Sequence, residues 1–86
     1  MSELKSVKLF QIERYLRDRN ANALYDAFEY IGDSISTQDL IMAEEDFNYR
    51  AYLVNIILDE VRTWNDAEID KIINHLRKNN EQHIQR

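Results

Sequence analysis

Residues that interrupt helices are almost missing from this chain, and their scarcity constrains its fold more than any other feature. Among 86 residues there is no proline and only one glycine, Gly32. Proline and glycine mark β-hairpins and irregular loops. Alanine, leucine, glutamate, arginine, lysine and glutamine are plentiful here, and they carry little helix penalty. The sequence therefore predicts an all-α fold.

Length and composition indicate one domain. A chain of 86 residues suffices for a single domain and not for two, and an apolar content of 44% is too high for a disordered segment. A domain this small buries only about 60–65% of its unfolded surface, so a partner often adds to its stability. We expect one helical domain over residues 1–86, with a frayed polar tail over about 79–86.

Two helices are expected in the first third of the chain. Segment 3–18 carries apolar residues on one broad side of a helix, although part of it also alternates like a strand. A helix is favoured because no second strand candidate exists to pair with it. Segment 21–31 begins after Asn20, which can cap it, and ends before Gly32, which suits a left-handed C-terminal cap.

Two further helices follow, each opened by a capping signal. Ser36 and Asp39 resemble a capping box, and nothing then interrupts the pattern until about Thr63. A helix over about 37–63 would be roughly 40 Å long. The last helix starts at the cap Asn65, with Glu68 three residues later. The prediction is a small four-helix bundle built around one long central helix.

The expected central helix is apolar on two sides. One side, together with apolar positions of the neighbouring helices, gives the predicted core: Leu24, Phe28, Ile31, Leu40, Phe47, Ala51, Val54, Leu58, Val61, Ile69, Ile72, Ile73 and Leu76. The other side is rich in tyrosine and is the candidate interface: Ile41, Met42, Tyr49, Tyr52, Leu53 and Ile56. Two interpretations stay open. Either the other helices bury this second stripe, or a partner covers it, most simply a second copy in a homodimer.

Charge is distributed unevenly along the chain. The net charge is −5, yet residues 20–66 hold ten acidic and two basic residues, while segments 1–19 and 67–86 are each slightly basic. The adjacent acids Glu44, Glu45 and Asp46 form a candidate docking patch for a protein with a basic surface. The candidate basic patch, which would serve a nucleic acid, comprises Lys5, Lys8, Arg14, Arg17 and Arg19.

Residue types needed for common chemistry are missing or wrongly spaced. Without cysteine the chain has no thiol nucleophile, disulfide or cysteine–zinc site. His75 and His83 lie eight residues apart, which is not the i, i+4 spacing of two ligands on one helix face. No glutamate has a histidine three residues later, as helical di-iron sites require. We expect no enzyme activity, no metal site and no cofactor.

Two short resemblances carry no family assignment. Residues 64–69, Trp-Asn-Asp-Ala-Glu-Ile, are similar to the opening of a Myb/SANT helix, but the other spaced tryptophans of that family are missing. In size, acidity and helical character the chain resembles the colicin DNase immunity proteins, which bind their target through an acidic surface. Their Tyr-Tyr-Pro segment is absent from this proline-free chain.

The sequence favours a small, acidic interaction protein: an adaptor, inhibitor or regulator that binds a protein partner. The alternative is a nucleic-acid-associated regulator that uses segment 5–19. The lack of cysteine favours a cytoplasmic location. The longest apolar run, residues 56–58, is far below the roughly 20 residues of a membrane span, so no membrane association is expected.

Overall fold

The computed structural model describes the backbone of residues 2–18 and 21–84, and the side chains of residues 5–18 and 22–79. These residues form five α-helices: α1 (Ser2–Asp18), α2 (Ala21–Tyr30), α3 (Thr37–Glu45), α4 (Phe47–Val61) and α5 (Asp66–Ile84). No β-strand occurs in this part of the chain. The all-α prediction is confirmed, and segment 3–18 is helical.

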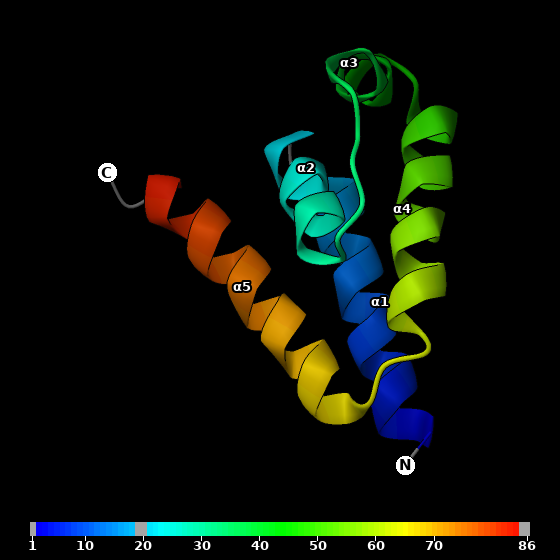
Figure 1. Cartoon of the computed structure of the whole chain (residues 1–86), viewed down its shortest axis with the longest axis vertical. Helices are drawn as coiled ribbons and strands as arrows, with labels where there is room; N and C mark the ends of the chain where they lie inside the picture. Colours follow the sequence, from blue (N-terminus) through cyan, green and yellow to red (C-terminus); the bar gives the residue numbers. More distant parts are fainter. Residues whose placement is uncertain (1, 19–20, 85–86) are drawn as a thin grey trace.

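The helices are arranged around α1 and α4, which lie side by side and run in opposite directions (Figure 1). Helix α3 lies across one end of this pair and contacts both α2 and α4. Helix α5 runs diagonally back from the α4–α5 turn and packs against α2 and α1. The short α2 touches three other helices, α3, α4 and α5.

The prediction of one central helix over about 37–63 is wrong, because the helix is broken at Asp46. This residue has an extended backbone, with φ −126° and ψ 107°. Its backbone N–H donates to the Met42 carbonyl at 2.8 Å, which closes α3. Its carboxylate accepts from the backbone N–H groups of Asn48 at 2.9 Å and Tyr49 at 3.3 Å, which opens α4. Aspartate prefers such caps because its side chain competes for backbone N–H groups.

Three other predicted helix ends are confirmed, and the predicted cap Asn20 lies outside the described residues. The Ser36 hydroxyl accepts from the Asp39 backbone N–H at 3.1 Å, and the Asn65 side chain accepts from the Glu68 N–H at 2.9 Å. Gly32 has φ 83°, the left-handed conformation expected after α2. Its N–H and that of the next residue bond back to carbonyls of α2 at 3.1 and 3.0 Å, the pattern of a Schellman cap.

The core draws on all five helices. Its buried apolar residues are Ile12, Leu16, Ala23, Leu24, Ala27, Phe28, Ala43, Leu53, Val54, Ile57, Leu58, Val61, Ile69, Ile72 and Leu76. The predicted core residue Phe47 is instead 61% exposed, because the break at Asp46 makes it the first residue of α4. The predicted core omitted α1, whose Ile12 and Leu16 are fully buried. Ile31, Leu40, Ala51 and Ile73 are half-buried.

Helix α5 continues to Ile84 and so extends into the expected tail. Fraying of residues 79–86 stays a prediction. Residues 85 and 86 lie outside the described part of the chain.

One charged residue lies inside the fold and joins two helices. Arg50 of α4 is 6% exposed, and its Nε and one terminal nitrogen both donate to the Leu16 carbonyl, the first at 2.9 Å. Leu16 belongs to the last turn of α1, where carbonyls have no partner within the helix. The guanidinium therefore caps α1 and places a positive charge at its negative end. Burial lowers the pKa of Arg50 from its ordinary value, because desolvation disfavours the charged form.

Candidate functional site

Both helices that meet at Asp46 carry exposed apolar side chains, and we call this region the α3–α4 corner. Ile41 and Met42 of α3 are 49% and 38% exposed, and Tyr52 of α4 is 58% exposed. Single exposed apolar residues are ordinary, but several on one small domain indicate a contact surface. These three are among the seven large apolar side chains that are exposed in the described part of the chain.

The six residues of the candidate interface do not form one continuous stripe. Since the helix breaks at Asp46, Ile41 and Met42 belong to α3, whereas the other four belong to α4. Leu53 is buried in the core at 4% exposure and is not part of any surface. Tyr49 and Ile56 are half-buried and pack against the core. The second stripe is thus partly core and partly surface. Leu53 is buried by the chain itself, as the first interpretation expects, whereas Ile41, Met42 and Tyr52 are exposed, as the second requires.

A hydrogen bond locks the corner. The Tyr49 hydroxyl donates to the Asp39 carboxylate at 2.6 Å and so ties α4 to the start of α3. This bond is the main reason that the pKa of Asp39 is lowered and that the pKa of Tyr49 is raised. The Tyr52 ring lies 5.8 Å from the Tyr49 ring, centroid to centroid. The exposed Tyr52 therefore lies next to a tyrosine that is held by a hydrogen bond.

The acidic docking candidates lie at the same corner but differ in their roles. Glu44 and Glu45 are exposed at the end of α3. Helical spacing places them on either side of Ile41, so an apolar side chain is flanked by two carboxylates. Asp46 is exposed as well, but its carboxylate caps α4. The corner therefore offers two carboxylates for a partner, with the third engaged in the fold.

Most of the candidate basic patch is engaged within the chain. Lys8 pairs with Asp70 of α5 at 2.9 Å, and its side chain is only 16% exposed. Arg17 pairs with Glu13 at 3.0 Å and lies over the Phe47 ring, 5.0 Å from its centroid. These cations hold helices together.

The remaining members of the basic patch vary in exposure. Arg14 lies 3.8 Å from Asp18 and remains 62% exposed. Lys5 is half-buried, and Arg19 lies outside the described residues. Of the four cations that the structure describes, three are therefore ion-paired within the chain.

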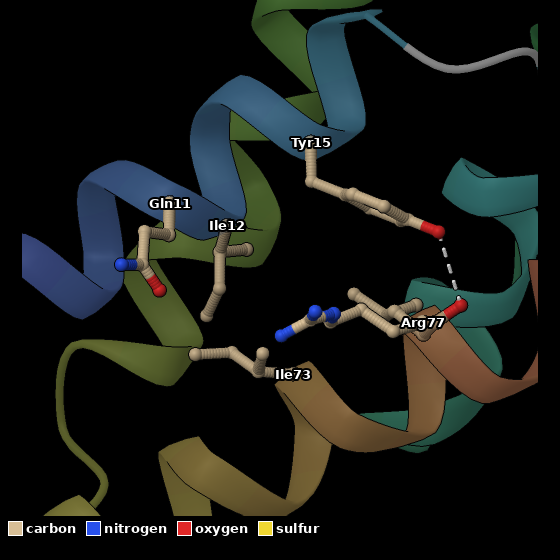
Figure 2. A pocket seen from close by; sticks show the side chains of 6 residues that line it. Gln11, Ile12, Tyr15, Ile73 and Arg77 are labelled. Carbon is tan, nitrogen blue, oxygen red and sulfur yellow. Dashed lines mark hydrogen bonds between the residues drawn. The ribbon is translucent and has the colours of Figure 1, made fainter. Parts of the chain in front are cut away.

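A slot between α1 and α5 is the site that sequence reasoning missed. It has a volume of about 210 Å³ and is lined by Gln11, Ile12, Tyr15, Ile73, Leu76 and Arg77. Figure 2 shows the Tyr15 ring on one side and the Arg77 side chain extending towards α1. The Tyr15 hydroxyl donates to the Leu76 carbonyl at 3.2 Å, which joins the two helices across the slot. The sequence signal is Tyr15 on the apolar side of segment 3–18, a side that the predicted core leaves out.

The structure describes the side chain of one of the two histidines, His75. His75 is half-buried, its ring lies 4.8 Å from that of Tyr30, and its Nε2 is 3.1 Å from the Asn79 side-chain nitrogen. The side chain of His83 lies outside the described ones. Within the described residues, no three histidine or carboxylate side chains are grouped as metal ligands.

Of the described helices, none combines the length and apolar content that crossing a lipid bilayer would require.

Comparisons with known proteins give no assignment. No protein family, no curated protein and no solved structure matches the chain.

Proposed function

We propose that this protein acts by binding a protein partner rather than by catalysis, and that the α3–α4 corner is its contact surface. The observation that carries the proposal is Tyr52, an aromatic residue that is 58% exposed. Its ring lies next to the ring of Tyr49, whose hydroxyl is hydrogen-bonded to Asp39. Tyrosine is enriched at the energetic centres of interfaces, because its ring is apolar and its hydroxyl is polar. A small cytoplasmic adaptor, inhibitor or regulator would work in this way.

The charge around the corner supports a partner with a basic surface. Glu44 and Glu45 lie beside the exposed Ile41, and residues 20–66 as a whole are strongly acidic. Such a field speeds encounter with a basic surface and disfavours an acidic one. The same field disfavours nucleic acid, and the alternative function through segment 5–19 has less support because Lys8 and Arg17 are ion-paired inside the chain.

Self-association is the second candidate for the corner. Ile41, Met42 and Tyr52 are exposed apolar residues on one small domain, and a two-fold dimer is the commonest arrangement that covers such a surface with its own copy. Tyr52→Glu tests it, because an exposed position accepts a charge in the monomer while a dry interface does not. We expect wild-type mass above 10.4 kDa by light scattering, and monomers for Tyr52→Glu. A wild-type monomer at high concentration would exclude the dimer.

Affinity capture tests the proposed function itself. Wild-type protein, Tyr52→Glu and Glu44→Gln/Glu45→Gln would each be used on nuclease-treated lysate of the source organism, with mass spectrometry of the captured proteins. We expect one protein to be captured by the wild type, lost with Tyr52→Glu and reduced with the glutamine variant. Its association rate with the glutamine variant should fall more than its dissociation rate rises.

The matched control is Asp59→Asn/Glu60→Gln, which removes the same charge from exposed residues at the other end of α4. Equal loss with the control would mean that net charge, not the corner, governs binding. Capture that survives Tyr52→Glu unchanged would contradict the choice of surface, and capture that disappears with nuclease would favour the nucleic-acid function.

A further inference from the structure

The joint between α3 and α4 consists of a single residue. Helix α3 ends at Glu45 and α4 begins at Phe47, so Asp46 alone connects them, and α3 lies across the end of α4 instead of in line with it (Figure 1). In an unbroken helix, the N–H groups of Asn48 and Tyr49 would donate to carbonyls four residues earlier. Here both donate to the Asp46 carboxylate, at 2.9 and 3.3 Å. The bend is therefore stabilised by one side chain that replaces backbone carbonyls.

The sequence across this joint is compatible with a continuous helix. Residues 37–61 contain neither glycine nor proline, the two residues that most strongly disfavour a helix interior. The extended backbone of Asp46 lies in an ordinary region that this residue leaves without strain. The bent and the continuous forms thus differ mainly in the hydrogen bonds of one joint, and the same residues can make both.

The contacts that hold α3 against the rest of the fold do not depend on which copy provides them. Helix α3 buries Ala43 alone, whereas α4 buries six residues. The Tyr49 hydroxyl donates to Asp39 across the joint, and α1 and α2 pack against α4 and α5. A second copy carries the same helices, so each of these contacts can also form between two chains. Only the joint itself has to change.

We propose that two copies of this chain exchange the unit α1–α3, with Asp46 entering a continuous helix over residues 37–61. In the resulting two-fold dimer, the α1–α3 unit of each copy packs on α4 and α5 of the other. The exchange keeps the core of both copies, and protein concentration sets the balance between monomer and dimer. This inference goes beyond the proposed function, because it concerns the joint and not the surface of the α3–α4 corner.

Two substitutions of Asp46 form a matched pair. Asp46→Ala and Asp46→Gly both remove the carboxylate, but alanine favours a continuous helix and glycine disfavours it by about fivefold per residue. Since the dimer contains two joints, its association constant should be about 25-fold higher for Asp46→Ala than for Asp46→Gly. Samples are held near the unfolding midpoint and cooled, so that chains can exchange, and light scattering then gives the mass relative to the 10.4 kDa chain.

Cross-linking distinguishes an exchanged dimer from two intact monomers in contact. Lys8 of α1 and Asp70 of α5 form an ion pair at 2.9 Å, and the chain has no cysteine of its own. Lys8→Cys/Asp70→Cys therefore provides one pair of thiols for a short thiol-specific cross-linker. In a monomer this link lies within one chain, whereas in the exchanged dimer it joins two chains. We expect covalent dimers on a denaturing gel for Asp46→Ala and cross-linked monomers for Asp46→Gly at equal concentration.

A third variant separates charge from helix formation. Asp46→Glu keeps the charge, and it should dimerise like Asp46→Ala because glutamate is a good helix former. Dimers that Asp46→Ala and Asp46→Gly form equally well would overturn the continuous helix. A monomeric Asp46→Ala at the highest concentration, or a dimer that cross-links only within its chains, would overturn the exchange. Tyr52→Glu added to Asp46→Ala should leave the covalent dimer unchanged, and its loss would place the contact at the corner instead.

Discussion

Replacing Arg50 tests whether one buried guanidinium holds α1 against α4. Arg50→Met keeps a long side chain in the core but removes both N–H donors to the Leu16 carbonyl. Leu16 is fully buried, and little water can reach its carbonyl to replace the lost bonds. The variant therefore leaves a carbonyl of the last turn of α1 without its partner.

The expected loss follows from three terms. A buried polar group left without its hydrogen bond costs about 1–3 kcal/mol, and loss of the cation at the end of the helix dipole costs about 0.3–1 kcal/mol more. Relief of the desolvation of the guanidinium acts in the opposite direction and offsets part of this. A net loss of about 2 kcal/mol should lower the melting temperature by roughly 8–16 °C in a domain of this size.

Urea unfolding followed by circular dichroism measures the free energy of unfolding directly. Arg62→Met is the control at the residue that follows α4, because Arg62 is exposed and lies 3.9 Å from Asp59 in an exposed pair. Such pairs contribute about 0–1 kcal/mol. Amide hydrogen exchange adds a local measurement, since the last turn of α1 should lose protection in Arg50→Met before the rest of the molecule does.

A variant Arg50→Met as stable as the wild type would refute this reasoning. It would mean that desolvation of the guanidinium costs as much as its two hydrogen bonds contribute, as happens in some buried ion pairs. A loss equal to that of Arg62→Met would refute the local role as well, because only general charge would then matter.

Two further changes test the corner. Asp46→Ala removes the cap of α4 and should cost about 1 kcal/mol of unfolding free energy in urea titrations, whereas Asp46→Asn should retain most of it; equal losses would rule out the cap. The folded-state pKa of Asp39 is lowered mainly by the hydrogen bond from Tyr49. This bond therefore stabilises the fold at pH values above the ordinary carboxyl pKa. The stabilisation is lost as the pH falls through the lowered pKa of Asp39. Tyr49→Phe should raise the pKa of Asp39 in a carboxyl ¹³C NMR titration, and an unchanged pKa would contradict the role of that bond.

Most helix ends could be predicted because their signals are local. Ser36, Asn65 and Gly32 each act within four residues of their own position, so a short stretch of sequence contains the whole mechanism. The break at Asp46 has the same local chemistry, an aspartate whose carboxylate accepts from the backbone N–H groups two and three residues later. It was missed because Asp46 follows two glutamates in an unbroken helical pattern, and an aspartate inside a helix surface is equally ordinary. Contacts between α3 and α2, which a local pattern does not contain, accompany the break.

Features that join distant segments could not be predicted from the sequence. Tyr15 bonds to a residue 61 positions away, and Arg50 to one 34 positions away. Neither bond leaves a trace in the spacing of apolar residues. The burial of Arg50 is contrary to its residue type, since arginine is seldom buried without a partner. The partner here is a backbone carbonyl, which every residue possesses and which therefore has no sequence signature.

The order of the helices explains how charge is distributed over the folded chain. The chain is slightly basic in its first and last segments and strongly acidic between them. The fold places α1 against α5, so the two basic segments of the sequence become neighbours in space. The acidic middle forms α2, α3 and α4, and the break at Asp46 exposes Glu44 and Glu45 at the corner. An unbroken helix would have kept Ile41 and Tyr52 on one straight face. Because the break lies between them, Ile41 and Tyr52 belong to two different helices that meet at Asp46.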